Sequence, residues 1–188
     1  MNKENYNFKP FPKLVTDRLI LRQMNNEDKD EIFALRSNKK VSQYINRPIA
    51  KEVDEALQYI EMINEGIDRN DWVLWAITLK ESNQLIGTIC LWNFSIEQSK
   101  GEVGYELSPE LQGKGIMQEA IKAVLEYGFK TIELQTIEGS VQTENQKSIQ
   151  LLERNKFINK GLENRESANE EGRHSYILEL TNERFFGN

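Results

Sequence analysis

Residues 101–124 read GEVGYELSPELQGKGIMQEAIKAV, and this stretch decides the fold. Its first seven residues are typical of a β-strand, and an amphipathic helix is predicted to begin at Ile116. Between these elements Gly113 and Gly115 flank Lys114. A strand, a glycine turn and a helix in succession direct backbone N–H groups and a helix N-terminus toward an anion, and Lys114 adds a positive charge. The stretch therefore predicts a turn that binds a pyrophosphate.

Two other phosphate-binding patterns do not fit this turn. The dinucleotide fingerprint G-x-G-x-x-G fails because Gln118 stands where its third glycine is required. The phosphate-loop pattern G-x-x-x-x-G-K-[S/T] is not met either. The turn therefore indicates neither a nicotinamide enzyme nor a nucleoside triphosphatase, and without its surroundings it would be read as an ordinary solvated turn.

Three segments of the chain resemble the GNAT acyltransferases. The coenzyme A loop of that family reads [Q/R]-x-x-G-x-[G/A], and Gln112, Gly115 and Met117 occupy its defined positions, with Met117 in place of the usual small residue. Residues 143–157 resemble the family segment E-N-x-x-S-x-x-L-L-E-x-x-G-F, with a lysine in place of its glycine. Residues 16–22 resemble the opening strand of the RimJ/RimL branch, which acetylates ribosomal-protein N-termini, although that branch also contains enzymes acting on other amines. The segments follow the family order and span nearly the whole chain.

The resemblance implies one GNAT domain over residues 1–188, an α/β fold whose mixed, mostly antiparallel sheet splays at the coenzyme A site and is flanked by helices. Hydrophobic patterning predicts strands at 19–22, 73–79, 85–92, 102–107, 134–141, 157–162 and 175–180, and helices following Asn26 and at 53–66, 116–129 and 146–154. Either Thr143 or Asn145 is expected to cap the last helix. The first thirteen residues are polar and are expected to be poorly ordered or loosely packed.

The resemblance also implies a co-substrate, acetyl coenzyme A, and no metal. The residues expected to form its pyrophosphate turn are Gln112, Gly113, Lys114, Gly115, Ile116 and Met117. Asn145 is expected to contact the pantetheine arm or the acceptor, and a helix-capping role is compatible with that contact. A single histidine and a single cysteine cannot form an ordinary Cys/His zinc site.

Acetyl transfer to an amine requires removal of an amine proton and stabilisation of the leaving thiolate. Glu102 is the candidate base, because the family often uses a carboxylate from this strand; a solvent-facing or ion-paired role is an equal alternative. Glu106 shares its strand face and is a weaker competitor. Ser148 is the candidate group near the departing sulfur. Family members often carry a tyrosine acid in that helix, but here the corresponding positions are Leu151 and Leu152.

Three further residues are given structural roles. Tyr105 is offset by three from Glu102, so we expect it to face the other side of the strand, as core or as a wall of the substrate site. Cys90 lies in a hydrophobic run and is expected to be a buried small side chain rather than an acetyl carrier. His174 is expected to be a wall residue or a structural histidine.

Composition limits the remaining choices. The chain of 188 residues has a net charge of −6, which disfavours a general nucleic-acid-binding role. No apolar run approaches the roughly 20 residues that cross a bilayer, so no membrane association is expected. One cysteine fits a reducing compartment, and we expect a cytoplasmic protein, a monomer or a homodimer.

The sequence therefore predicts an acetyl-coenzyme A-dependent N-acetyltransferase that acts in a ternary complex on a primary amine. The favoured acceptor is an α-amino group, at a protein N-terminus or on a small amino compound. Two alternatives remain open: an enzyme that acetylates a small amine such as a polyamine or an antibiotic, and a catalytically silent coenzyme A-binding module that senses or recruits a partner. Acceptor contacts are expected from the loops 47–54 and 93–100.

Overall fold

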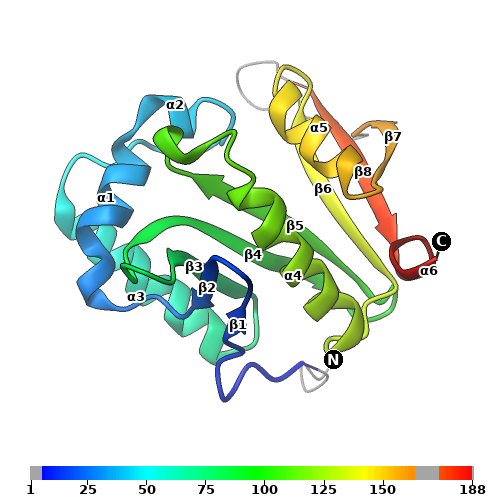
Figure 1. Cartoon of the computed structure of the whole chain (residues 1–188), viewed down its shortest axis with the longest axis horizontal. Coiled ribbons are helices and arrows are strands. Elements are labelled where there is room, and N and C mark those ends of the chain that lie inside the picture. Colours follow the sequence, from blue (N-terminus) through cyan, green and yellow to red (C-terminus); the bar gives the residue numbers. More distant parts are fainter. Residues whose placement is uncertain (1–5, 164–173, 188) are drawn as a thin grey trace.

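A computed structural model describes residues 6–163 and 174–187. Its centre is an eight-stranded sheet in the order β1-β2-β3-β4-β5-β6-β8-β7 (Figure 1). The strands are β1 (Leu14–Val15), β2 (Leu19–Arg22), β3 (Val73–Leu79), β4 (Leu85–Ser95), β5 (Lys100–Leu107), β6 (Thr136–Gln142), β7 (Ile158–Leu162) and β8 (Ser175–Thr181). Neighbouring strands are antiparallel except for the parallel pair β5 and β6. The predicted mixed, mostly antiparallel sheet is confirmed.

Helices connect and cover this sheet. They are α1 (Lys29–Ser37), α2 (Lys39–Ser42), α3 (Val53–Asp68), α4 (Ile116–Lys130), α5 (Gln146–Arg154) and α6 (Asn182–Phe186), with short 3-10 turns at Asn26–Asp28 and Pro109–Leu111. Helix α4 lies across the sheet and buries an apolar face that includes Ile121 and Leu125 (Figure 1). No helix in the described ranges is long and apolar enough to cross a membrane.

The sheet opens between β5 and β6. These strands are in register only at Lys100–Thr136, Gly101–Ile137 and Glu102–Glu138, although both continue beyond that point. In Figure 1 they run together at one end and separate toward α5 at the other. The separation leaves the end of β5 without a sheet neighbour on that side, so its backbone and side chains border a space that a ligand can enter.

Local details refine the predicted boundaries. The first helical turn is capped by Asn25, not Asn26, because the Asn25 side chain accepts from the Glu27 N–H and Asp28 completes the capping box. Helix α5 is capped by Asn145, whose Oδ1 accepts from the Ser148 N–H at 3.2 Å. Thr143 does not cap the helix.

The N-terminal segment differs from expectation where it is described. Phe8 is buried, with 1% of its surface exposed, and its ring packs beside Phe94. The indole of Trp75 donates a 2.6 Å hydrogen bond to the Pro12 carbonyl. Residues 6–13 are therefore packed onto the sheet, because two of their aromatic side chains, Phe8 and Phe11, join core contacts that the polar composition concealed. Residues 1–5 lie outside the described ranges.

Candidate active site

The glycine turn has the backbone conformation that its sequence predicted. Gly113 and Gly115 have φ angles of +76° and +73°, in the left-handed region that favours glycine. Gly115 is the N-cap of α4, and no described side chain caps that helix, so its first N–H groups stay available to an anion. A Cβ at Gly113 would meet no atom within 4 Å. The open space and uncapped helix fit a pyrophosphate.

Thr16 and Arg18, which precede β2, hold this turn by side-chain contacts. The Arg18 guanidinium donates to the Lys114 carbonyl at 3.0 Å and pairs with Glu119 in the first turn of α4 at 2.6 Å. Thr16 Oγ1 also donates to Glu119, at 2.6 Å. Desolvation alone would raise the Glu119 pKa, but the hydrogen bonds from Thr16 and Arg18 outweigh it and lower that pKa. The resemblance of residues 16–22 to a family strand gave no indication that Thr16 and Arg18 hold this turn.

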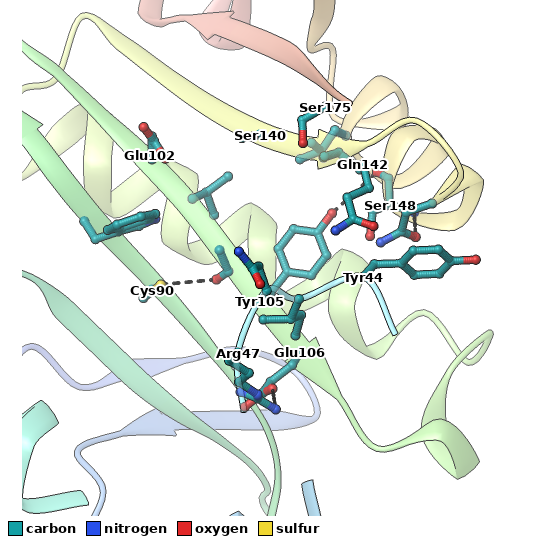
Figure 2. A pocket seen from close by; sticks show the side chains of 18 of the residues that line it. Tyr44, Arg47, Cys90, Glu102, Tyr105, Glu106, Ser140, Gln142, Ser148 and Ser175 are labelled. Atoms are coloured by element: carbon teal, nitrogen blue, oxygen red, sulfur yellow. Dashed lines mark hydrogen bonds and ion pairs between the residues drawn. The ribbon is translucent and has the colours of Figure 1, made fainter. Parts of the chain in front are cut away.

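A cavity of about 610 Å³ occupies the opening in the sheet. It is lined by β4, β5, β6, the start of α5 and the loop after α2. Figure 2 shows side chains from these elements turned toward one space. The predicted site residues that line it are Glu102, Asn145 and Ser148, and the other residues considered by sequence analysis that line it are Cys90, Tyr105, Glu106, Leu152 and His174. Among the described residues, no group of three His, Cys, Asp or Glu side chains could hold a metal ion.

The candidate base lies where the sheet begins to open. Glu102 occupies the last register pair between β5 and β6, and it borders the cavity. Its Oε1 accepts a 2.6 Å hydrogen bond from the Asn93 side-chain amide. Because that described partner is neutral, the carboxylate charge of Glu102 is not cancelled by it. The geometry is compatible with a base and also with a cation-binding carboxylate.

Glu106 has a different environment. It is buried, and its Oε2 lies 2.7 Å from Arg47 Nη2, with only 5% and 13% of the two side chains exposed. That contact is not aligned as a hydrogen bond, so we describe it as an ion pair. Thr88 Oγ1 donates to the other carboxylate oxygen at 3.3 Å. Both carboxylate oxygens of Glu106 are therefore in contact with neighbouring side chains, one with Arg47 and the other with Thr88.

The start of α5 forms the opposite side of the cavity. Asn145 and Ser148 both line it, while the Asn145 side chain caps the helix. The Tyr105 hydroxyl reaches this turn from β5 and donates to the Ser148 carbonyl at 3.4 Å. Tyr105, like Glu102, borders the cavity, and it lies at a point on β5 where β6 has already separated. Figure 2 shows its ring between β5 and α5.

The glycine turn and α5 are linked by side chains. Lys147 of α5 donates to the Gln112 side-chain carbonyl at 3.5 Å, and Gln112 donates back to the Leu107 carbonyl at 3.3 Å. Gln112 therefore ties the turn to the end of β5 as well as to α5. A ligand bound at the turn would extend toward the opening between those two elements.

Cys90 is poorly suited to carry an acetyl group. Its sulfhydryl donates to the Gly104 carbonyl at 3.5 Å, and desolvation by burial raises its pKa to about 12. A thiol in that state is almost entirely protonated at neutral pH, and only the thiolate is a strong nucleophile. His174 is exposed at the edge of the cavity.

The acceptor wall was located only in part from sequence. Of the loop 47–54, only Arg47 lines the cavity, together with the preceding residues Tyr44, Ile45 and Asn46. No residue of 93–100 lines it, and the exposed Trp92 does so just before that range. The cavity also includes Ser140 and Gln142 of β6. No local sequence pattern distinguishes these residues, because they converge only when the sheet forms.

A family model described as acetyltransferase (GNAT) domain matches residues 18–158. The chain belongs to the GNAT family. It is similar to YoaA of Bacillus subtilis, an uncharacterized N-acetyltransferase, with 34% identity over 152 residues that cover 81% of this chain and 86% of YoaA. The resemblance found in the sequence is therefore confirmed, and the protein is an acetyl-coenzyme A-dependent N-acetyltransferase.

Two GNAT structures illustrate the range of relatives. The spermidine N-acetyltransferase of Vibrio cholerae, solved with coenzyme A and spermine, superposes with a TM-score of 0.77 at 25% identity and covers 90% of this chain and 98% of its own. The ribosomal-protein-S5-alanine acetyltransferase of Vibrio fischeri has the same TM-score at 20% identity, with coverages of 93% and 98%. The fold is thus shared by enzymes named for both kinds of acceptor.

Proposed function

We propose that this GNAT enzyme acetylates an α-amino group, at a protein N-terminus or on a small amino compound, by direct attack within a ternary complex. Acetyl coenzyme A supplies the activated acetyl group. The glycine turn, with Gly113 and Gly115, binds its pyrophosphate, and Asn145 contacts the pantetheine arm. This assignment is supported by the uncapped start of α4 and by the cavity that opens between β5 and β6.

Direct attack is supported by the absence of an activated nucleophile from the cavity wall described above. Cys90 is the sole cysteine of the chain, and its thiol is held protonated by burial. The acceptor nitrogen instead attacks the thioester carbon, a C–N bond forms, and the C–S electron pair leaves with sulfur. Glu102, acting directly or through water, removes the amine proton. Positioning of the two substrates in one cavity supplies much of the acceleration.

The observation that carries the α-amine assignment is that β5 offers the cavity one carboxylate that is not paired with a cation. Of its two β5 carboxylates, Glu106 is paired with Arg47, so Glu102 is the β5 carboxylate that acts on the amine. An α-amine has an unperturbed pKa near 7.7–8.0, whereas that of a lysine side chain is about 10.4. A much larger fraction of the α-amine is therefore already neutral at pH 7, and a single carboxylate is sufficient for it.

A second acceptor class is favoured by one specific comparison. The chain is 27% identical over 78% of its length to a spermidine N(1)-acetyltransferase of Vibrio cholerae. Glu102, with its neutral partner, and the exposed ring of Trp92 at the cavity would also suit a cationic polyamine. The two acceptor classes are therefore tested together.

The experiment is a competition for acetyl transfer, read by mass spectrometry. Peptides with free and with blocked N-termini, each containing one lysine, are mixed with spermidine and acetyl coenzyme A. We expect the acetyl group on the free N-terminus. Exclusive acetylation of lysine side chains, or of spermidine over every peptide, would refute the α-amine assignment and leave the acetyltransferase activity intact.

A further inference from the structure

Tyr105 places a hydroxyl group in the cavity between β5 and α5. Its hydroxyl reaches across the opening in the sheet and meets α5 at the Ser148 carbonyl. The oxygen–oxygen distance of 3.4 Å is long for a hydroxyl hydrogen bond, which normally measures about 2.7–2.8 Å. The hydroxyl is therefore weakly held and can turn toward a stronger acceptor that enters the cavity.

The cavity wall holds several polar donors, among them Gln142 and Asn145, and the hydroxyls described at the first turn of α5 are those of Ser148 and Tyr105. The sequence of α5, residues 146–154, contains no tyrosine, and Leu152 presents only an apolar side chain to the cavity. Ser148 contributes a hydroxyl at the same turn. Two other tyrosines line the cavity: the half-buried Tyr59, whose ring is covered by the Arg36 guanidinium at 3.9 Å from its centre, and Tyr44, which lies on the loop after α2.

We propose that Tyr105 donates its hydroxyl hydrogen bond to the coenzyme sulfur as the C–S bond breaks, sharing with Ser148 the stabilisation of the thiolate. The proposal rests on the proposed function, with the pantetheine arm at Asn145, and on the predicted position of the departing sulfur near Ser148 in the first turn of α5. When acetyl coenzyme A is bound, the Tyr105 hydroxyl exchanges its long hydrogen bond to the Ser148 carbonyl for a charge-assisted hydrogen bond to the departing sulfur. Hydrogen bonds to charged acceptors are roughly twice as strong as those between neutral groups.

Tyr105 keeps its proton throughout this step. Burial raises its pKa to about 12, well above the roughly 8.5 of an ordinary thiol, so transfer of its proton to the thiolate is unfavourable. The electron pair of the C–S bond stays on sulfur, and the amine proton leaves by way of Glu102 or water. Product coenzyme A then takes a proton from solvent. Tyr105 lowers the energy of the departing thiolate without changing its own charge.

The test compares Tyr105→Phe with Tyr127→Phe. Tyr127 of α4 is a matched control because it is also partly buried with a raised pKa, but it packs edge-on against Trp75 at 5.5 Å and does not line the cavity. Each variant is first bound to coenzyme A alone. The thiol of the bound coenzyme is titrated through the ultraviolet absorbance of its thiolate, with desulfo-coenzyme A complexes as the baseline.

We expect Tyr105→Phe to raise the pKa of the bound thiol by about one unit, because a donor to the thiolate has been removed. Its kcat should fall about 10- to 100-fold, as for loss of a hydrogen bond to a charged group, with acetyl coenzyme A affinity unchanged. Tyr127→Phe should match the parent in all three measurements. A parent-like thiol pKa in Tyr105→Phe, or a loss of coenzyme binding in a folded Tyr105→Phe protein, would overturn the proposal.

The thiol titration contains no acceptor. Its outcome is therefore independent of whether the enzyme prefers an α-amine, a lysine or a polyamine, and failure of the acceptor assignment is distinguishable from failure of the Tyr105 assignment.

Discussion

Replacement of Gly115 tests the coenzyme turn most directly. A Cβ built on Gly115 would have its nearest neighbour, Arg18 Nη2, at 3.5 Å, which is an ordinary contact. The penalty is therefore conformational, because φ is +73° and a side chain in the left-handed region costs about 1–2 kcal/mol. If the turn must keep this conformation to bind pyrophosphate, Gly115→Ala should weaken acetyl coenzyme A binding by roughly 5- to 30-fold. The β-branched Gly115→Val should weaken it further.

Gly161 provides the control for backbone strain. It has a φ of +102°, a Cβ there would meet nothing within 4 Å, and it lies on β7 rather than on the cavity wall. Gly161→Ala should lower the melting temperature without altering affinity, whereas the Gly115 variants should lose affinity in isothermal titration calorimetry. A Gly115→Val protein that binds acetyl coenzyme A as tightly as the parent would show that the pyrophosphate binds elsewhere.

Three further changes probe the site. Glu102→Gln should lower turnover at neutral pH by about 100-fold while leaving coenzyme affinity nearly intact, and the deficit should shrink at high pH as free amine accumulates; an unchanged pH–rate profile would remove Glu102 from the mechanism. Cys90→Ala should retain activity apart from a packing loss, and an acetylated Cys90 that passes its acetyl group on, detected by intact mass, would contradict direct transfer. Glu119 has a lowered pKa, so the stability it contributes is present above its unfolded pKa and is lost as pH falls through its folded pKa. Glu119→Gln should therefore flatten the acid side of a plot of melting temperature against pH, and an acid limb as steep as that of the parent would exclude this carboxylate.

Local chemistry made the backbone conformation of the glycine turn predictable. Two glycines flanking a lysine at a strand-to-helix junction specify positive φ angles, and both glycines have them. Long amphipathic elements such as α3 and α4 were also found with boundaries shifted by no more than two residues. The short β1, α2 and α6 were not predicted, because two to five residues carry too little periodicity and form only against the rest of the fold.

The contacts that complete the site could not be read from the chain. Arg18 meets Glu119 across 101 positions, and Arg47 meets Glu106 from the loop between α2 and α3. Strand alternation predicted that Tyr105 and Glu102 face opposite sides of β5, yet both residues line the cavity. It could not reveal that β6 has separated at that point, and this separation is what gives the Tyr105 side chain access to the cavity.

The separation of β5 from β6 divides the sheet into two blades joined at one end. Beyond Glu102 and Glu138 the facing edges of β5 and β6 are not paired with each other. Each part of the sheet therefore has an unpaired strand edge inside the molecule, and proteins usually pair or cover such edges. A coenzyme arm bound in this space would lie between the two edges, where a strand would otherwise be, and would contact both parts of the sheet. Bound coenzyme would therefore stabilise β6, β8 and α5 together against local unfolding. The stabilisation would increase with the concentration of coenzyme.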